Sequence, residues 1–455
     1  MNRVVRGIYN ILFAVFFVLS SPYYFLRMWR RGSRQTGFPW KKGFSQRFGK
    51  YDSKLKQAIT NRHRLWMHAV SVGEVNVSTQ LIQAMETRLP NLKIIISTTT
   101  TTAMEGLQSK LPSHVSKIYY PIDRRAWVSR ALGTIRPEAI VLVEAEIWPN
   151  FLWRAEQLRI PIFLVNARLS DSSYRGYKRF GFLFRPIFAS FAAVGAQNED
   201  DAAKLHQLGC RSEAIHIVGS LKFDAAKLDG KRGLDVPAML RQLGLAADAQ
   251  IIVAGSTHAG EESILAEQFI QLRKKFPKLF LVIVPRHMER SRSVGKDLSA
   301  HGLKFVYRSD VNGEAQYGPG EVECLVVNTT GELRYFYESA TIVFVGKSLT
   351  EKGGQNPIEP AALGKPTVFG PNMQNFRDVV RCLLAKDGAV QVRDQRELEN
   401  VVEKLLADPH RREQLGHNGM QVVRENLGAV ERTVDMIVKH LEGSELYVAP
   451  KAGSL

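Results

Sequence analysis

From residue 64 onward, short apolar segments alternate with longer amphipathic segments, and this alternation restricts the chain to one class of fold. The apolar segments are rich in β-branched residues, as strands buried on both faces are. Amphipathic segments such as 75–88 and 151–159 fit helices between them. Regular strand–helix alternation predicts an α/β fold built on parallel sheets. The predicted strands are 65–70, 93–98, 117–120, 139–143, 160–165, 192–196, 215–218, 251–254, 279–284, 324–327, 341–345 and 366–369.

The alternation is interrupted once, by a polar stretch at residues 225–237 that contains glycines and charges and has the composition of a linker. We therefore expect two Rossmann-like parallel-sheet domains that face a cleft, with ligands at the carboxyl ends of the strands. A long helical tail is expected from residue 397 to about 441. The predicted division is 1–50, 51–224, a linker at 225–245, 246–420, and a C-terminal helix and tail at 421–455.

The first 50 residues carry ten Lys or Arg and no acidic residue, so they hold +10 of the net charge of +18. No charged residue lies between Arg6 and Arg27, and this apolar span is about the roughly 20 residues that a bilayer-crossing helix needs. Arg27 and Arg30 follow the span where a signal peptide would have a small-residue cleavage site, so cleavage is not expected. The heavier basic flank lies after the span, which predicts that the body faces the cytoplasm.

Two alternatives to a membrane-spanning helix follow from the same residues. The helix could lie in the membrane interface, with the basic cluster at 27–50 against anionic lipid headgroups. Basic charge also attracts nucleic acid, but the charge is concentrated beside an apolar anchor and no nucleic-acid motif is present, so no nucleic-acid partner is expected. The three cysteines, Cys210, Cys324 and Cys382, match no metal or disulfide pattern and indicate cytosolic thiols.

The segment GGQNPIEPAALGKPTVFGP at residues 353–371 follows a predicted buried strand. Asn356 is placed as a helix N-cap, Pro357 fits the first helical position, and Glu359 lies three residues after the cap. A glycine-rich loop that leads into a helix start offers unpaired N–H groups to an anion. The alternative is an ordinary turn between a strand and a helix.

Polar and charged residues recur after several other predicted strands, where the carboxyl ends of parallel strands gather at one edge of a sheet. The motifs concerned are SVGE (71–74), VEAEIWPN (143–150), NARLS (166–170), AQNEDD (196–201), GSLKFD (219–224), STHAGEE (256–262), VPRH (284–287), TGEL (330–333) and GGQNPIE (353–359).

These nine motifs, in this order, resemble the lipid A-specific 3-deoxy-D-manno-octulosonic acid (Kdo) transferases of bacterial lipopolysaccharide synthesis, which are membrane-associated GT-B glycosyltransferases of family 30. The resemblance runs from the N-terminal anchor to at least residue 380. It implies an inverting enzyme that transfers Kdo from CMP-Kdo to a lipid A precursor, lipid IVA, and releases CMP. It also implies an inner-membrane location, with one N-terminal anchor in the membrane lipids and the catalytic domains on the cytoplasmic face.

The resemblance also implies roles for individual residues. Glu74 is the expected general base, which an inverting transfer needs to take the proton of the acceptor hydroxyl; the alternative is that Glu74 only stabilises the start of a helix. Glu144 and Lys222 match positions implicated in stabilising the transition state. The alternatives are a loop hydrogen bond for Glu144, with Glu146 as an equally placed rival, and a surface charge for Lys222.

The donor CMP-Kdo is expected to bind residues of the second domain. Arg286 could hold a phosphate with both ends of its guanidinium group, and Glu359 could accept hydrogen bonds from the ribose. The expected donor-binding set is Pro285, Arg286, Thr330, Gly331, Glu332, Asn356, Pro357, Ile358 and Glu359.

No metal or other cofactor is expected. His258 and His287 form a loose pair whose spacing fits no standard metal motif. The resemblance likewise implies metal-independent transfer. Two positions depart from the family pattern, which often has glycine at Lys347 and histidine at Gln355. Two other functions fit the same motifs: a GT-B glycosyltransferase that uses another nucleotide sugar, and a non-catalytic, membrane-anchored nucleotide-binding protein.

Overall fold

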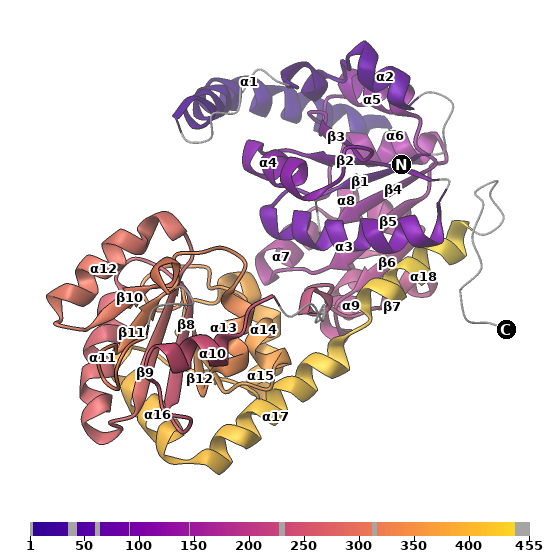
Figure 1. The fold of residues 1–455 in the computed structure, drawn as a ribbon. Helices are drawn as coiled ribbons and strands as arrows, with labels where there is room; N and C mark the ends of the chain where they lie inside the picture. Colours follow the sequence, from indigo (N-terminus) through magenta and orange to yellow (C-terminus); the bar gives the residue numbers. More distant parts are fainter. Residues whose placement is uncertain are drawn as a thin grey trace. The chain divides into compact units, whose positions relative to one another are not determined.

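The computed structural model describes residues 3–34, 43–59, 64–90, 92–144, 146–226, 233–311 and 316–441. The chain divides into two compact units, Met1–Ala225 with Gly428–Leu455, and Ala226–Leu427, which we call the first and second units (Figure 1). Each unit contains a seven-stranded sheet in which every described pairing is parallel. The predicted α/β fold with two Rossmann-like domains is therefore confirmed.

The sheet of the first unit has the strand order β3-β2-β1-β4-β5-β6-β7. Its strands are β1 Arg64–His68, β2 Lys93–Thr98, β3 Ser116–Tyr119, β4 Ala139–Val143, β5 Ile162–Ala167, β6 Ala193–Ala196 and β7 Ile215–Ile217. Its helices are α1 Arg3–Arg34, α2 Ser53–Ile59, α3 Val72–Arg88, α4 Thr101–Lys110, α5 Arg125–Ile135, α6 Pro149–Gln157, α7 Asp171–Arg179, α8 Gly181–Ala189, α9 Glu199–Leu208 and α18 Ala429–Leu441.

Helices cover both faces of this sheet, because side chains along a strand point alternately to opposite faces (Figure 1). On β1, Leu65 and Met67 join a buried cluster that includes residues of α3 and α18. Trp66, between them, joins a second cluster that includes Phe151 of α6 and Phe188 of α8. The two clusters fix β1 in the middle of the sheet, so the loop after β1 is held by buried structure on both sides.

The sheet of the second unit has the strand order β10-β11-β9-β8-β12-β13-β14. Its strands are β8 Gln250–Thr257, β9 Leu279–Pro285, β10 Phe305–Tyr307, β11 Cys324–Val326, β12 Ile342–Val345, β13 Thr367–Phe369 and β14 Val390–Gln391. Its helices are α10 Val236–Gln242, α11 Glu261–Lys275, α12 Ser291–Ala300, α13 Leu333–Ser339, α14 Ile358–Ala362, α15 Arg377–Ala385, α16 Gln395–Ala407 and α17 Pro409–Asn426.

The C-terminal part differs from the predicted continuous helix. It forms α16, α17 and α18, because Asp408 and Pro409 start a new helix after α16 and Gly428 adopts a left-handed φ of 84° between α17 and α18. The predicted boundary at 421 falls inside α17, whereas the units divide after Leu427. Helix α18 thus belongs to the first unit.

The predicted linker at 225–245 also needs correction. Residues 227–232 lie outside the described part of the chain, but Val236–Gln242 form the helix α10. Its residues Val236, Met239 and Leu240 are buried, so this segment is part of the second unit. Asp235 starts the helix by accepting a hydrogen bond from the Ala238 N–H at 2.9 Å.

Helix α1 contains the one candidate membrane segment found among the described residues, Val4–Tyr23, which is long and apolar enough to cross a membrane. Its side chains Leu12, Phe16 and Leu19 are exposed. Lys41 and Lys42, which belong to the predicted basic segment, lie outside the described residues.

Candidate active site

Glu74 stands in the first turn of α3, directly after β1, and its backbone and side chain form a reciprocal capping box with Ser71. The Ser71 hydroxyl accepts a hydrogen bond from the Glu74 N–H at 3.2 Å, and a Glu74 carboxylate oxygen accepts one from the Ser71 N–H at 3.2 Å. The other carboxylate oxygen accepts a hydrogen bond from the Val70 N–H at 2.7 Å. Glu74 therefore stabilises the start of α3, the role that was the alternative to catalysis. The same hydrogen bonds hold its carboxylate in a fixed orientation.

The same carboxylate has an unusual environment. Glu74 is only 7% exposed, and this burial raises its pKa to about 7. The charges of Glu144 and Glu146 raise the pKa further, while the hydrogen bonds from Val70 and Ser71 oppose the rise. A general base works best when its pKa lies near the operating pH, so Glu74 combines fixed orientation with a suitable basicity.

Glu144 and Glu146 follow β4, the neighbour of β1 in the sheet, which explains why their charges reach Glu74. Glu146 accepts a hydrogen bond from the Trp148 indole N–H at 2.7 Å, and burial raises its pKa. Glu144 adopts a left-handed φ of 60°, and its N–H donates to the Val165 carbonyl at 3.0 Å. A non-glycine residue in this conformation is strained, and such strain concentrates at functional sites. The alternative to a catalytic role for Glu144 was a hydrogen bond from its side chain to the loop. Such a bond is seen for the side chain of Glu146, which bonds to Trp148.

Lys222 follows β7, at the edge of the sheet, and two strands separate β7 from β4. Its loop is nevertheless firmly held, because the Asn166 side-chain oxygen accepts a hydrogen bond from the Leu221 N–H at 3.2 Å. On the other side, the buried Asp224 accepts hydrogen bonds from the N–H groups of Gly428 and Val430, at 2.7 and 2.6 Å. The structure places Glu74 and Glu144 after adjacent strands, and the loop of Lys222 reaches back to Asn166 in β5, the strand next to β4.

In the second unit, Asn356 and Glu359 lie together at the start of α14. The Asn356 side chain accepts a hydrogen bond from the Ile358 N–H and donates one to a Glu359 carboxylate oxygen, both at 3.0 Å. The helix begins at Ile358, one residue later than predicted, and Pro357 precedes it. Burial raises the pKa of Glu359, and the nearby Arg334 and Arg286 oppose that rise. The charge of Arg286 thus reaches Glu359, to which Asn356 is hydrogen-bonded.

The other predicted donor residues occupy the ends of neighbouring strands. Pro285 ends β9 and is buried, whereas Arg286 is exposed. Glu332 is paired with Arg308, with two oxygen–nitrogen distances of 3.1 and 3.4 Å, and accepts a hydrogen bond from the Thr329 hydroxyl at 2.6 Å. Gly331 adopts a left-handed φ of 82°, and Thr330 beside it is exposed. Glu332 therefore has a structural partner in addition to its predicted role.

The sequence analysis missed Glu261, a fully buried carboxylate that ties two strand ends together. It accepts hydrogen bonds from the N–H groups of His258, Lys347, Ser348 and Leu349, at 2.9, 2.8, 2.8 and 3.0 Å. The sequence feature that could have indicated Glu261 is its position in the STHAGEE motif, directly after a predicted strand. Lys347 adopts a left-handed φ of 56°, a conformation that suits the glycine of the family pattern.

No group of three or more His, Cys, Asp or Glu residues that could hold a metal ion occurs in the described ranges of the chain. The rings of His258 and His287 lie 6.1 Å apart, centre to centre.

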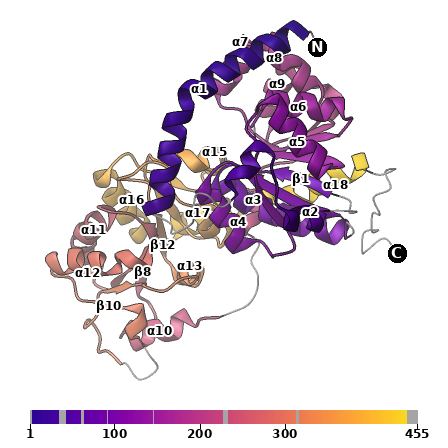
Figure 2. The same cartoon turned by 90° about the horizontal axis from the view of Figure 1, so that it is seen from above.

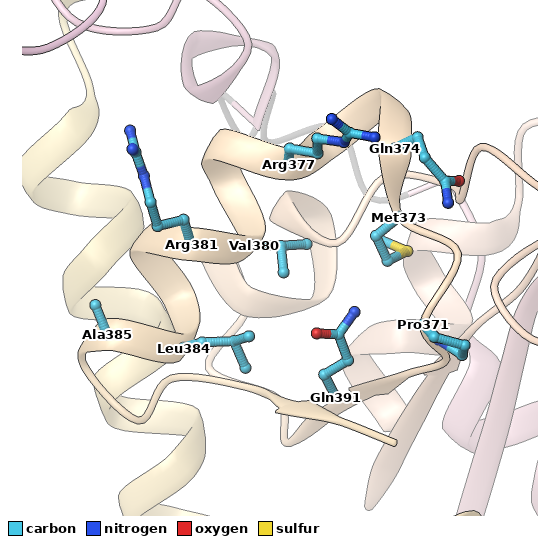
Figure 3. A pocket seen from close by; sticks show the side chains of 9 residues that line it. All are labelled: Pro371, Met373, Gln374, Arg377, Val380, Arg381, Leu384, Ala385 and Gln391. Carbon is cyan, nitrogen blue, oxygen red and sulfur yellow. The ribbon is translucent and has the colours of Figure 1, made fainter. Parts of the chain in front are cut away.

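A cavity of about 680 Å³ lies beside α15 in the second unit (Figure 3). It is lined by Pro371, Met373, Gln374, Arg377, Val380, Arg381, Leu384, Ala385 and Gln391, and none of these belongs to the predicted donor set. The glycine loop reaches this wall, since the Gly353 N–H donates to the Gln374 side chain at 2.7 Å. The cavity therefore adjoins the loop without being the predicted nucleotide site.

Comparison with solved structures supports the fold. The UDP-GlcNAc 2-epimerase from Neisseria meningitidis bound to UDP-GlcNAc aligns with 83% of this chain and all of its own, with a TM-score of 0.54 and 14% identity. A glycosyltransferase from Rickettsia africae aligns with 84% of this chain and all of its own, with a TM-score of 0.53 and 11% identity. These similarities indicate the two-domain GT-B architecture.

Comparison of sequences defines the family. Residues 42–225 match the family model described as 3-deoxy-D-manno-octulosonic-acid transferase (kdotransferase), and residues 315–422 match glycosyl transferases group 1. The chain is 32% identical to the 3-deoxy-D-manno-octulosonic acid transferase of Haemophilus influenzae, over 83% of this chain and 87% of that protein. It is 31% identical to that of Bordetella pertussis, over 95% and 98%. The motifs, the fold and these relatives together identify the chain as a glycosyltransferase of the 3-deoxy-D-manno-octulosonic acid transferase family.

Proposed function

We propose that this Kdo transferase takes Kdo from CMP-Kdo and transfers it to a lipid A precursor, lipid IVA, with inversion and release of CMP. The acceptor hydroxyl oxygen forms a bond to the anomeric carbon of Kdo while the bond from that carbon to the CMP phosphate oxygen breaks. The hydroxyl proton passes to the enzyme, and CMP leaves with the bonding electron pair. The family membership supports this substrate pair.

The observation that carries the mechanism is the buried Glu74 carboxylate, with a pKa raised to about 7 and an orientation fixed by two backbone N–H groups. Such a group can accept the hydroxyl proton at neutral pH. Glu144, at the adjacent strand end, supplies negative charge close to Glu74. Negative charge stabilises the positive character that develops on the sugar ring as the bond to CMP breaks. Lys222 is the proposed partner of an anionic group, the Kdo carboxylate or the phosphate.

CMP-Kdo is proposed to bind the second unit, where Arg286 and Asn356 lie near Glu359. Arg286 is exposed and can bind a phosphate in bidentate fashion. The Glu359 carboxylate is a proposed acceptor for ribose hydroxyls. Side-chain cations and backbone N–H groups would then stabilise the leaving phosphate, so the proposed reaction needs no metal.

We further propose that α1 holds the protein at the inner membrane, with the catalytic units on the cytoplasmic face. The contacts of α1 favour the interfacial alternative over a spanning helix, because its residues Arg6, Tyr9 and Phe17 touch the body of the first unit. A helix that packs on a folded unit along one face and exposes apolar residues on the other suits the plane of the interface. Exposed Phe180 and Phe182, beside Lys178 and Arg179, are a second apolar and basic element of that unit.

The proposal is tested by transfer itself. Detergent-solubilised protein is incubated with freshly generated CMP-Kdo and tetra-acylated lipid IVA, with Glu74→Gln in parallel and a chelator in one arm, and products are counted by mass spectrometry. We expect product from the wild type, with or without chelator, and none from the variant. Folded wild type that yields no product here but uses another nucleotide sugar contradicts the donor assignment.

A further inference from the structure

A second cavity, of about 410 Å³, lies within the first unit between α1 and the ends of the sheet strands. Its walls are mainly apolar, and its volume falls in the range of roughly 300–1,000 Å³ that is usual for small-molecule sites. From α1 it is lined by Phe13, Phe17 and Ser20 among others, and from the body by residues that include Thr99, Ile122 and Trp148.

Helix α1, which Figure 2 shows as one long helix, is fixed to the body of the first unit by contacts of its N-terminal half. The Tyr9 hydroxyl donates a hydrogen bond to the buried Asp123 carboxylate at 2.8 Å, and the Asn150 amide donates one to the Asn10 side-chain oxygen at 3.0 Å. The Phe17 ring meets the Trp127 ring edge-on, with centroids 5.6 Å apart. The inner face of α1 is therefore a wall of the first unit, while the outer face remains exposed and apolar.

The lining combines apolar and polar side chains. We call Phe13 and Phe17 from α1, with Ile122 and Trp148 from the body, the apolar wall. Among the polar lining residues, the Arg47 guanidinium donates a hydrogen bond to the Thr99 carbonyl at 2.8 Å.

Polar residues of the lining are linked to the proposed base by a short series of contacts. Thr99 lies between Thr98 and Thr100, whose hydroxyls donate to the Val70 carbonyl at 3.5 and 3.3 Å. The N–H of the same Val70 holds the Glu74 carboxylate at 2.7 Å. Glu146, which also lines the cavity, is near enough to Glu74 for its charge to act there.

We propose that this cavity receives an acyl chain of the lipid acceptor, so that α1 forms part of the acceptor site as well as the membrane anchor. The inference rests on the proposed function, since it assumes an acylated sugar acceptor. The apolar wall suits a hydrocarbon chain, and the exposed apolar face of α1 gives such a chain a path from the membrane interface. The contacts from Thr99 through Val70, and the charge of Glu146, connect the cavity to Glu74, where the sugar of the bound acceptor would react.

The first test blocks the cavity without changing the anchor. Ser20 lines the cavity, whereas its neighbour Leu19 is 76% exposed on the outer face. Ser20→Trp should raise KM for the tetra-acylated acceptor by ~10-fold or more, the scale of a steric mismatch in an apolar pocket, and leave KM for CMP-Kdo unchanged. The control Leu19→Trp adds the same side chain to the outer face, keeps that face apolar, and should leave KM for the acceptor unchanged in detergent solution. Equal KM values for both variants would overturn the proposal.

The second test does not depend on turnover. A phosphorylated glucosamine disaccharide with diazirine-labelled acyl chains is bound to the protein, irradiated, and the labelled peptides are mapped. We expect label on α1 and on residues 120–123, and loss of that label in Ser20→Trp but not in Leu19→Trp. Label confined to other segments would overturn the acyl site. Label on the cavity in a protein that transfers no Kdo would support the acyl site and contradict the proposed reaction. Failure of the acyl site can therefore be distinguished from failure of the proposed function.

Discussion

Glu74 has two roles that substitution can separate, because it both caps α3 and presents a buried carboxylate. Glu74→Gln removes the base and should lower kcat by about 10²–10⁴-fold, the usual contribution of general base catalysis. Ser71→Ala removes the matching half of the capping box and should lower the free energy of unfolding by ~1 kcal/mol, with kcat close to wild type. Steady-state kinetics and denaturant titrations of both variants give the comparison. If kcat falls in both variants in step with stability, Glu74 is a capping residue only.

The pH dependence of transfer should reveal the same carboxylate. Glu74 accepts a proton only when ionised, and its pKa is raised to about 7, so kcat/KM should fall as the pH drops through about 7. Glu146→Gln keeps an oxygen for the Trp148 hydrogen bond but removes a nearby negative charge, which should lower the pKa of Glu74. The acid limb of the pH profile should therefore move to lower pH. A limb that stays in place would mean that another group controls it.

Protein stability should change with pH in the opposite direction. The pKa of Glu74 in the folded state is raised above its usual value of 4.5, so protonation favours the folded state. The stabilising contribution is fully present below about pH 4.5 and is lost as the pH rises through about 7. Denaturant titrations of wild type and Glu74→Gln across this window should converge at low pH. The wild type should become relatively less stable at high pH.

Sequence reasoning placed residues well where the cause is local. Glu74 was expected at the start of a helix and lies in the first turn of α3, because its capping box with Ser71 spans one helical turn. The helix itself begins at Val72, three residues before the predicted start at 75. Glu261 could not, because three of its four N–H donors are 86 to 88 residues away in sequence. The pairing of Glu332 with Arg308, 24 residues away, was hidden for the same reason.

At the level of elements, apolar strands were predicted and two short, partly buried strands were missed. Strands β2 and β4 have the predicted bounds, 93–98 and 139–143, because each has a continuous apolar centre. Strands β10 and β14 are short and only partly buried, whereas the equally short β11 and β13 are buried and were predicted. The helical breaks at Asp408 and Gly428 were overlooked because the apolar spacing continues on both sides of them.

Helix α18 depends on a single buried carboxylate from a distant part of the chain. Asp224 accepts hydrogen bonds from the Gly428 and Val430 N–H groups, 204 and 206 residues away, and so caps the start of α18. Asp224→Ala leaves these donors without that partner and should destabilise the docked helix by about 1–3 kcal/mol. Hydrogen exchange of α18 should accelerate accordingly. Asp408→Ala, which removes the corresponding cap of α17, should leave exchange in α18 unchanged.

At the scale of the whole molecule, α1 is where sequence alone was least decisive. Its length and hydropathy fit a spanning helix and an interfacial helix equally. The distinguishing information lies in contacts across 114 and 140 residues, from Tyr9 to Asp123 and from Asn10 to Asn150. These contacts join the N-terminal part of the apolar segment to the body, and they are the reason that we propose the interfacial arrangement.

An interfacial α1 makes a clear prediction about topology. If the helix lies in the membrane plane, its N-terminus stays on the same side as the catalytic units, whereas a spanning helix carries the N-terminus to the opposite face. An N-terminal epitope tag should therefore resist protease added outside intact spheroplasts and be cleaved only after lysis. The protein should still sediment with membranes at high salt, because the exposed Leu12, Phe16 and Leu19 side chains bind through apolar contact that salt does not screen. Cleavage of the tag in intact spheroplasts, with the body protected, would require the Tyr9–Asp123 contact to open in the membrane. It would also separate α1 from the cavity that we assign to the acyl chain.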